Sequence, residues 1–444
     1  MTKETKKRIY RFFWQIIVAG ATLLPFIYIW SERLNILLRA RYENKGNIMM
    51  WGLYLILMLV FLYTFNAFTI GDGRKSHLLI GQGVAYFCLN IIEIMITILM
   101  VGRVKHIKAI LVAYLILYVI QLVELFVFTS LGTDLYRKLI PPYQMLHIYG
   151  DNNNNLAIKM SGHRAKYHFE EEVSYHMDWE QLKEKIKKYD AILVNDLPAK
   201  ERNVLIKYCF EIKKRVYFTP KISDIILKAS DDMNLLDTPL YLCKNMDISL
   251  PRRFVKRAMD IVISLVGIII TSPIMLVTAI AIYAYDKGPV IYKQVRCTKD
   301  LKEYEICKFR SMIVDAEKDG KARLAKDHDD RITPVGKWIR RLRIDELPQF
   351  FNILAGDMSV VGPRPERPEL IAKNCEKVPE FVYRTRVKAG LTGYAQVYGR
   401  YNTSFYDKLK LDLIYVNNYS IALDIRLIMM TLKIIFMKES TEGV

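Results

Sequence analysis

An acidic pair, Asp345-Glu346, stands directly behind a run of cations and is the part of this sequence best suited to phosphate chemistry. Five cations and no carboxylate lie between positions 331 and 343: Arg331, Lys337, Arg340, Arg341 and Arg343. An ionised carboxylate can attack phosphorus as a nucleophile, and neighbouring cations can bind the phosphate oxygens. The contrast between the cation-rich stretch and the acidic pair that follows it therefore predicts a nucleophile inside a phosphate-binding site.

The residues after the pair predict an amphipathic helix that would position it. Apolar side chains recur with helical spacing at Leu347, Phe350, Phe351 and Leu354. Pro348 is acceptable only in a first turn, so Asp345 is expected to be the N-cap. The positive end of a helix dipole favours a carboxylate or an approaching phosphate, and it would keep Asp345 ionised at neutral pH. The alternative is that Asp345 only caps the helix and that Arg343 solvates it.

Three further segments could bind phosphate near the pair: Gln294-Val295-Arg296, Lys308-Phe309-Arg310-Ser311-Met312 and Gly362-Pro363-Arg364-Pro365-Glu366. Arg can meet a phosphate with two parallel donors, whereas Lys acts as a point charge. Each segment alone is typical of a strand edge or a rigid turn. Taken together, they indicate a shared site.

The apolar residues, 52% of the chain, are concentrated in long uncharged runs, which indicates a membrane protein with soluble parts. Four runs near the length of a bilayer span are Phe12 to Trp30, Met49 to Ile70, Leu78 to Val101 and Ile107 to Phe128. The basic tail before the first run predicts a cytoplasmic N-terminus, and four crossings would return the chain to that side.

The net charge of +19 fits contact with anionic lipid and phosphorylated substrates. A basic chain could equally bind nucleic acid, but no recognition module is present and the apolar runs would need another explanation. The six cysteines show no Cys-x-x-Cys spacing, so the sequence indicates neither a zinc site nor a disulfide framework.

Short apolar strands alternate with polar-faced helices between positions 144 and 243, which predicts a small open α/β domain. The expected strands are 146–149, 191–194 and 216–218, and the expected helices lie near 179–188 and 200–213. A dinucleotide site would need Gly-x-Gly-x-x-Gly after the first strand, but Gly150 is followed by Asp151 and four asparagines. We therefore interpret this part as a degenerate nucleotide-binding fold with a regulatory or assembly role.

A further uncharged run, Ile261 to Tyr285, contains Ser272-Pro273 near its midpoint. Proline removes a backbone donor and clashes with the carbonyl four residues back, so a kink is expected. On hydropathy alone the run predicts a kinked spanning helix. A helix that turned back would instead leave the domains before and after it on one side of the membrane.

The stretch from about Lys256 to Thr431 resembles the catalytic domain of the bacterial sugar transferase family, the monotopic phosphoglycosyl transferases. Besides the segments already named, the matching residues are Arg331-Ile332-Thr333, Asp345-Glu346-Leu347-Pro348-Gln349, Asn352, Gly356-Asp357-Met358-Ser359 and Leu391-Thr392-Gly393-Tyr394-Ala395-Gln396. Two departures from the family pattern are Lys388-Ala389-Gly390, where Arg-Pro-Gly is usual, and Tyr394, where Trp is usual.

The four apolar runs and the α/β part resemble the larger members of this family, which begin exopolysaccharide, capsule or O-antigen synthesis. The resemblance therefore implies an architecture for the whole chain. Residues 1–135 would form a four-helix transmembrane bundle and residues 140–248 a degenerate Rossmann-like cytoplasmic domain. Residues 251–444 would form a mixed helical and α/β catalytic domain, with a re-entrant membrane helix over 254–285 broken at Ser272 and Pro273. The expected location is the bacterial cytoplasmic membrane, with the catalytic domain facing the cytoplasm.

The resemblance also implies the chemistry. Asp345 would attack the sugar-bearing phosphate of a UDP-sugar, UMP would leave, and undecaprenyl phosphate would take the phosphosugar, here a hexose phosphate, from Asp345. Glu346 would help to hold Mg²⁺. The residues expected to contact the phosphates are Lys308, Arg310, Arg343 and Arg364, with Gln294, Arg296 and Glu366 as further members of the site. A homo-oligomer and polysaccharide-assembly proteins are further expected partners, and nucleic acid is not.

Two alternatives of other classes remain open at the level of sequence. Asp327-His328-Asp329 has the Asp-x-Asp form with which metal-dependent glycosyltransferases hold a nucleotide-sugar diphosphate, although it is also typical of a solvated turn. Such an enzyme would release UDP rather than UMP. The other alternative is a non-catalytic membrane scaffold for polysaccharide assembly, in which Asp345 would be dispensable.

Overall fold

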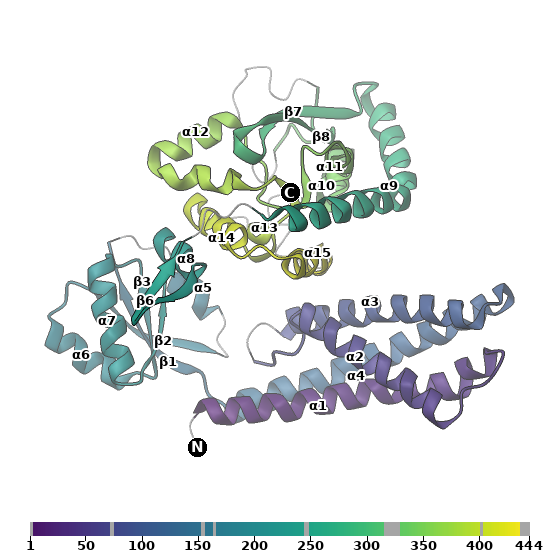
Figure 1. The fold of residues 1–444 in the computed structure, drawn as a ribbon, viewed down its shortest axis with the longest axis horizontal. Coiled ribbons are helices and arrows are strands. Elements are labelled where there is room, and N and C mark those ends of the chain that lie inside the picture. The colour runs from purple at the N-terminus through teal and green to yellow at the C-terminus, as the bar shows by residue number, and fades with distance from the viewer. Residues whose placement is uncertain are drawn as a thin grey trace. The chain divides into compact units, whose positions relative to one another are not determined.

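The computed structural model describes residues 3–71, 75–151, 156–162, 166–243, 248–314, 329–399 and 403–435 (Figure 1). Their contacts divide the chain into two compact units, Met1–Pro220 and Lys221–Val444. Each unit has hydrophobic clusters of its own, and we describe the two in turn.

The first unit begins with long apolar helices. These are α1 (Lys3–Ile29), α2 (Asn44–Thr64), α3 (Lys75–Val101) and α4 (Ile107–Leu139). Helix α4 packs against α1 and α3, and α2 packs against α3. In the part of the chain that the structure describes, five helices are long and apolar enough to cross a membrane, namely these four and α9 (Leu250–Asp286). The predicted apolar runs therefore form helices, although α2 ends at Thr64 and not at Ile70.

Buried polar side chains join these helices. Gln121 of α4 donates to the Tyr54 hydroxyl of α2 at 2.7 Å, and Asn90 of α3 donates to the Gln121 side-chain oxygen at 3.0 Å. A polar group in an apolar helix must find a partner within the protein, because lipid offers none. These contacts therefore fix which faces of α2, α3 and α4 meet.

A parallel sheet with the strand order β2-β1-β3-β4 forms the rest of the first unit. The strands are β1 (Tyr143–Tyr149), β2 (Tyr167–Ser174), β3 (Ala191–Asn195) and β4 (Arg215–Phe218). Helices α6 (Trp179–Lys188) and α7 (Ala199–Glu211) pack on Leu146, Ile148, Ile192 and Val194. Helix α5 (Leu156–Ser161) packs beside Met145 and Leu193, which point to the opposite face because strand side chains alternate. The alternation of strands and helices in an open α/β domain was predicted, but β2 and α5 were not.

Gly150, which follows β1, lies where a dinucleotide-binding loop would begin. A Cβ atom on Gly150 would lie 2.2 Å from the Asp196 carbonyl oxygen, and the Gly150 amide donates to the Asn195 carbonyl at 2.9 Å. The glycine therefore allows the ends of β1 and β3 to approach closely. The asparagines at 152–155, predicted to be a loop, lie outside the described residues.

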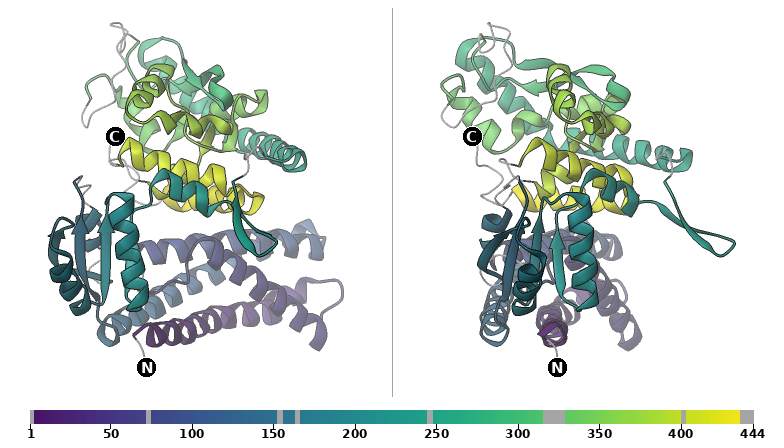
Figure 2. Two further views of the ribbon diagram at one scale, coloured as in Figure 1. Left: turned by 60° about the vertical axis from the view of Figure 1, so that its left-hand side comes forward. Right: turned by 90° about the vertical axis from the view of Figure 1, so that its left-hand side faces the viewer.

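The second unit begins earlier than the sequence predicts. We expected the middle domain to continue to residue 248, but Ile222 and Ile225 of α8 (Ile222–Lys228) pack with Leu409 and Leu413 of α14 (Phe405–Asn417). The hairpin of β5 (Asp231–Leu235) and β6 (Thr238–Leu242) follows α8, and all ten of its residues are exposed. Figure 2 shows it projecting from the rest of its unit.

The remaining elements of the second unit pack in several hydrophobic clusters, one of which includes Ile353, Met358, Val361, Tyr415 and Leu427. Strands β7 (Ile291–Cys297) and β8 (Glu303–Phe309) form an antiparallel pair, and β9 (Ser359–Val361) pairs in parallel with β10 (Gly390–Thr392). The helices are α9, α10 (Pro334–Arg341), α11 (Gln349–Ala355), α12 (Pro368–Lys377), α13 (Tyr394–Tyr398), α14 and α15 (Ile421–Ile435).

Helix α9 changes direction along its length, as Figure 1 shows. Pro273 lies inside it and has no N–H to offer the carbonyl of Ile269. The Ser272 hydroxyl donates to that carbonyl instead, at 2.9 Å, and the Thr271 hydroxyl donates to the Gly267 carbonyl at 2.7 Å. Hydroxyl groups that replace backbone donors in this way bend helices. Ser272-Pro273 therefore accounts for the predicted change of direction.

We predict that the bend shortens the distance between spin labels placed at Val262 and Ile280, two exposed positions on opposite sides of Pro273. In a straight helix the 18-residue separation would span about 27 Å. Pulsed electron paramagnetic resonance of the full chain, with the native cysteines replaced, should give a shorter distance. Pro273→Ala should lengthen it, because the alanine N–H can again reach the Ile269 carbonyl.

A label pair at Phe254 and Ile269, both exposed and both before the proline, provides the control. Its distance should not change in Pro273→Ala. A wild-type distance already at the straight-helix value between Val262 and Ile280 would contradict the assignment of the bend to this proline.

Candidate active site

The acidic pair lies in a 3₁₀ turn, Ile344–Glu346, between α10 and α11. The prediction that Asp345 is the N-cap of the next helix is wrong, because α11 begins only at Gln349 and Pro348 occupies the position before it. Arg343 explains why α11 begins later than predicted. Its left-handed conformation (φ 57°) ends α10, and the chain then needs one tight turn before it can start α11.

Three cations from three segments meet at the Glu346 carboxylate. Arg364 Nη2 lies 2.9 Å from Oε1, Lys308 Nζ lies 3.6 Å from Oε1, and Arg343 Nη1 lies 3.5 Å from Oε2. The Glu346 side chain is 10% exposed. A buried carboxylate needs such partners, because its charge has lost its water. Both carboxylate oxygens of Glu346 thus face cations, and Asp345 lies next to Glu346 in the turn.

The two acids of the pair have opposite pKa shifts. Burial opposes ionisation of Glu346, but Arg364, Lys308 and Arg343 outweigh it and hold the pKa of Glu346 well below its usual range. Burial raises the pKa of Asp345 to about 6, and the negative charge of Glu346 adds to this effect. The predicted helix-cap effect on Asp345 is therefore not what sets its pKa. Asp345 still remains mostly ionised at neutral pH, since its pKa lies below 7.

Lys308 reaches Glu346 from β8, and Asn352 of α11 fixes that strand. The buried Asn352 amide accepts from the Cys307 N–H and donates to the Glu305 carbonyl, both at 2.8 Å. Burial lowers the pKa of Lys308, while the charge of Glu346 opposes that shift. Asn352 thus sets the register between the strand that carries Lys308 and the helix that follows the acidic pair.

Arg364 reaches Glu346 from the turn after β9. The Gly362 amide donates to the Thr392 carbonyl at 2.8 Å, and the Gly390 amide donates to the Pro363 carbonyl at 2.9 Å. A Cβ atom on Gly362 would lie 2.2 Å from the Lys388 carbonyl, so only glycine permits this close approach. The Thr-Gly segment named in the sequence therefore supports the Arg364 turn from behind.

The other predicted residues form a second cluster behind Arg364. Arg296 donates to the Gln294 side-chain oxygen at 2.6 Å, and its guanidinium lies 3.8 Å from the Glu366 carboxylate. Burial lowers the pKa of Arg296, an effect that the charge of Glu366 opposes. Gln294, Arg296 and Glu366 therefore lie together, and Glu366 joins them to the turn that carries Arg364.

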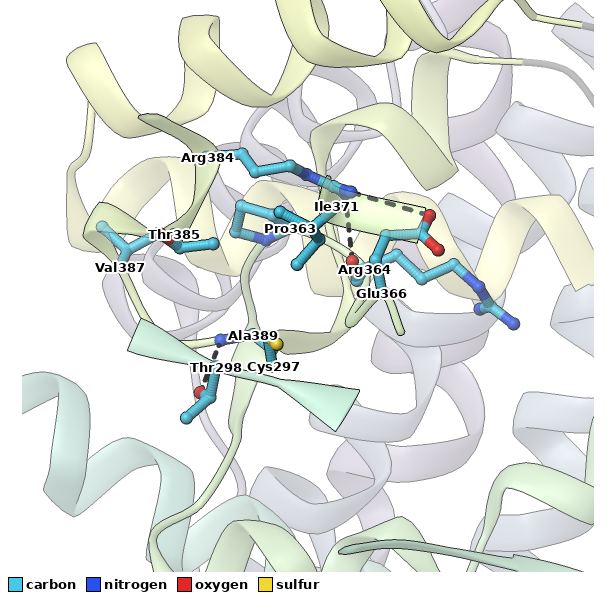
Figure 3. Close-up of a pocket in the computed structure, with 10 residues that line it drawn as sticks. All are labelled: Cys297, Thr298, Pro363, Arg364, Glu366, Ile371, Arg384, Thr385, Val387 and Ala389. Atoms are coloured by element: carbon cyan, nitrogen blue, oxygen red, sulfur yellow. Dashed lines mark hydrogen bonds and ion pairs between the residues drawn. The ribbon is translucent and has the colours of Figure 1, made fainter. Parts of the chain in front are cut away.

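Arg384 and Asp412 belong to this cluster but were not predicted. Arg384 donates to the Arg364 carbonyl at 3.0 Å, lies 3.6 Å from Glu366 and pairs with the buried Asp412 at 2.8 Å. Figure 3 shows Arg384 linked to the Arg364 backbone and to Glu366, while the Arg364 side chain points away from it. No spacing in the sequence connects residues 364, 384 and 412, so only the fold identifies this cluster.

Arg310 has different partners from the other predicted cations. Its guanidinium forms a two-pronged pair with Asp286 at the end of α9, at 2.7 Å for Nη1, and its Nε donates to the Pro289 carbonyl at 2.7 Å. The side chain is buried. Arg310 thus ties β8 to the end of α9, and its donors are engaged within the protein.

The alternative acidic motif can be described only in part. Asp327 and His328 lie outside the described residues. Asp329 pairs with Arg331, whose Nε and Nη2 atoms lie 2.8 and 2.6 Å from its carboxylate. The Asp329 carboxylate thus has a cation partner already.

The site thus combines a buried Glu346, a half-buried Asp345 and three cations in a unit that also contains a membrane-length helix. Residues 251–438 match the family model described as bacterial sugar transferase. An uncharacterised sugar transferase of Bacillus subtilis is 37% identical over 187 residues, which cover 42% of this chain and 90% of that protein. The chain belongs to the bacterial sugar transferase family.

Two other relatives have assigned activities. A UDP-N-acetylgalactosamine-undecaprenyl-phosphate N-acetylgalactosaminephosphotransferase of Aeromonas hydrophila is 37% identical over 262 residues, 56% of this chain and 59% of the relative. A UDP-glucose:undecaprenyl-phosphate glucose-1-phosphate transferase of Klebsiella pneumoniae is 44% identical over 181 residues, 40% of this chain and 39% of the relative. The matches thus span 35% to 59% of the length of the first curated relatives.

We predict that Asn352→Ala destabilises the second unit, because the N–H of Cys307 and the carbonyl of Glu305 both lose their partner in the buried Asn352 side chain. Leaving two such groups unpaired should lower the free energy of unfolding by about 2 to 4 kcal/mol. Denaturant unfolding of the detergent-solubilised chain would measure the change. Asn418→Ala is the matched control, since that side chain is exposed, and it should change stability by less than about 0.5 kcal/mol. Equal effects of the two variants would contradict the role of Asn352.

Proposed function

We propose that this chain transfers a sugar-1-phosphate from a UDP-sugar to undecaprenyl phosphate and releases UMP. The observation that carries the proposal is the division of roles within the acidic pair. Glu346 is held by Arg364, Lys308 and Arg343, while Asp345 has a raised pKa that lies just below neutral. The names of the Aeromonas hydrophila and Klebsiella pneumoniae relatives support the same reaction.

In the first step, a carboxylate oxygen of Asp345 attacks the phosphorus that carries the sugar. The bond from that phosphorus to the oxygen bridging the two phosphates breaks, and UMP leaves with the electron pair. The phosphosugar is then joined to Asp345 as an acyl phosphate. In the second step, a phosphate oxygen of undecaprenyl phosphate attacks the same phosphorus and releases the Asp345 carboxylate. The lipid product is an undecaprenyl diphosphate sugar.

The cations are placed to offset charge that develops on the phosphates. Arg364, Lys308 and Arg343 already surround one negative charge, so a diphosphate that approaches Glu346 meets donors that need little rearrangement. Arg296, Gln294 and Glu366 hold the Arg364 turn in the proposed arrangement. Arg310 contributes through its pair with Asp286 and not as a phosphate contact.

The donor set also fits a Mg²⁺ ion that is bound only with substrate. Among the described residues, no group of three His, Cys, Asp or Glu side chains is close enough to hold a metal alone. Mg²⁺ usually takes one or two carboxylates and completes its shell with water and substrate phosphates. Glu346, with its neighbour Asp345, would hold it, and the ion would neutralise charge on the departing nucleotide.

Helix α9 is proposed to dip into one leaflet and return. Both of its ends belong to the same compact unit: Lys256 near its start bonds to the Val361 carbonyl, and Asp286 at its end pairs with Arg310. A full crossing would require one folded unit to lie on two sides of a bilayer. The proposed location is therefore the cytoplasmic membrane, with the catalytic unit on the cytoplasmic side, where nucleotide sugars are found.

The two alternative functions make different predictions. A metal-dependent glycosyltransferase would release UDP, and a scaffold would release no nucleotide. Incubation with undecaprenyl phosphate and UDP-glucose, UDP-galactose or UDP-N-acetylgalactosamine should instead yield UMP with one or more of these donors. The donor that supports release identifies the sugar.

We predict that the chain incubated with its UDP-sugar, but without lipid acceptor, gains the mass of a phosphosugar. Asp345→Asn should form no adduct and should lose UMP release by about 10³-fold or more, because the amide is not a nucleophile. Intact-protein mass spectrometry would measure the adduct. Asp300→Asn is the control, because that carboxylate is exposed, and it should form the adduct normally. An adduct that persists in Asp345→Asn would exclude Asp345 as the nucleophile.

We also predict an acid limb in the pH profile of the adduct-forming step. Only ionised Asp345 can attack, and its pKa is about 6, so the rate should fall about tenfold per pH unit below that value. Arg340 lowers the pKa of Asp345, so Arg340→Gln should move the limb to higher pH. Stopped assays of UMP release between pH 4.5 and 8 would test this. A rate that stayed level down to pH 4.5 would contradict the raised pKa of Asp345.

A further inference from the structure

The first turns of α9 carry charged residues that point into the catalytic unit. Lys256 is 7% exposed and Asp260 is 3% exposed, although both lie on a helix whose other side chains are mostly apolar. Burying a charge is costly unless it is paired and hydrogen-bonded. Their partners therefore show what this part of α9 holds in place.

Lys256 is bound to the end of β9 and to α15. Its Nζ atom donates to the Val361 carbonyl at 2.9 Å and pairs with Asp424 Oδ2 at 2.8 Å. The Tyr415 hydroxyl completes the group, at 2.8 Å from Asp424 Oδ1 and 3.1 Å from the Val361 carbonyl. The Lys256 charge thus stabilises the last residue of the strand.

Asp260, one turn further along α9, binds the first part of the same strand. Its Oδ1 atom accepts from the Val360 N–H and from the Ser359 hydroxyl, both at 2.9 Å. Lys256 and Asp260 together therefore contact all three residues of β9. The turn that follows this strand carries Arg364 to Glu346.

Arg257 of the same turn binds α11. Its two terminal nitrogens donate to the carbonyls of Ile353 and Leu354, at 2.6 and 2.7 Å. The last carbonyls of a helix have no donors within the helix, so a guanidinium that serves two of them fixes the end of α11. The opposite end of α11 begins three residues after Glu346.

We propose that Lys256, Arg257 and Asp260 are positioning residues that set the distance between the two halves of the site. Lys256 and Asp260 place Arg364 through β9, and Arg257 places Asp345-Glu346 through α11. The two halves meet in the pair between Arg364 and Glu346, so the membrane helix determines the geometry at which the nucleophile meets phosphate. This inference rests on the proposed transfer reaction.

The sharpest test is a matched pair of substitutions at Asp260. Asn retains an oxygen that can accept both bonds from β9, whereas Ala retains none. Asp260→Ala should slow adduct formation about 10- to 100-fold, since a misplacement of about 1 Å can have that effect. Asp260→Asn should remain near the wild-type rate. Val262→Ala, at an exposed position on the same helix, controls for general changes to α9.

A second variant covers the case in which Asp260→Ala does not fold. Arg257→Lys keeps the charge but cannot reach two carbonyls with one planar group, so it should also slow adduct formation, by about tenfold. For both variants the KM for the UDP-sugar should stay within about twofold of wild type while kcat falls, because neither substitution removes a residue that is proposed to contact the substrate. Melting temperature is recorded in parallel to separate loss of rate from loss of fold.

The outcomes separate this inference from the proposed function. If the wild-type chain forms no phosphosugar adduct, the proposed function fails. If the wild type forms it and folded Asp260→Ala or Arg257→Lys forms it at the wild-type rate, the positioning role is overturned. A fall in kcat at unchanged KM, restored in Asp260→Asn, supports it.

Discussion

Keeping the charge of Glu346 stable in a buried place is the constraint on which the rest of the catalytic unit depends. An unpaired carboxylate at this depth would take up a proton, and the cations around it would then repel one another. Arg364, Lys308 and Arg343 come from three different elements, so β8, the turn after β9 and the turn before α11 can meet only in one arrangement. The ion pairs of Glu346 therefore hold these three segments together at the site.

The same ion cluster explains why two adjacent acids behave differently. Glu346 takes the direct contacts with the cations, and Asp345 receives only their more distant effect while it is exposed to the negative charge of its neighbour. Glu346 therefore stays ionised, whereas the pKa of Asp345 is raised to about 6. This separation suits the role proposed for Asp345, which is to bond to phosphorus and later leave it.

The sequence predicted the features that depend on local composition. The apolar runs predicted the membrane-length helices. The alternating pattern between positions 144 and 243 predicted α6 and α7, and Ser272-Pro273 predicted the bend in α9. Strand β2 was missed because its repeated glutamates hide the alternation expected of a strand at the edge of a sheet. The N-cap assignment of Asp345 failed because nothing in the sequence shows that Arg343 adopts a left-handed conformation. Arg310 pairs with Asp286, and Arg384 pairs with Asp412. Both pairs join segments that are distant in the sequence, so residue spacing could not predict them.

Arg343 also shows a conflict between backbone strain and charge pairing in this domain. A side chain in the left-handed region costs about 1 kcal/mol relative to glycine, which adopts that conformation freely. Glycine at this position would end α10 without that strain, but it would remove one of the three cations that face Glu346. The buried Glu346 charge would then be less well paired. The strained backbone at position 343 is therefore tied to a side chain that the site requires.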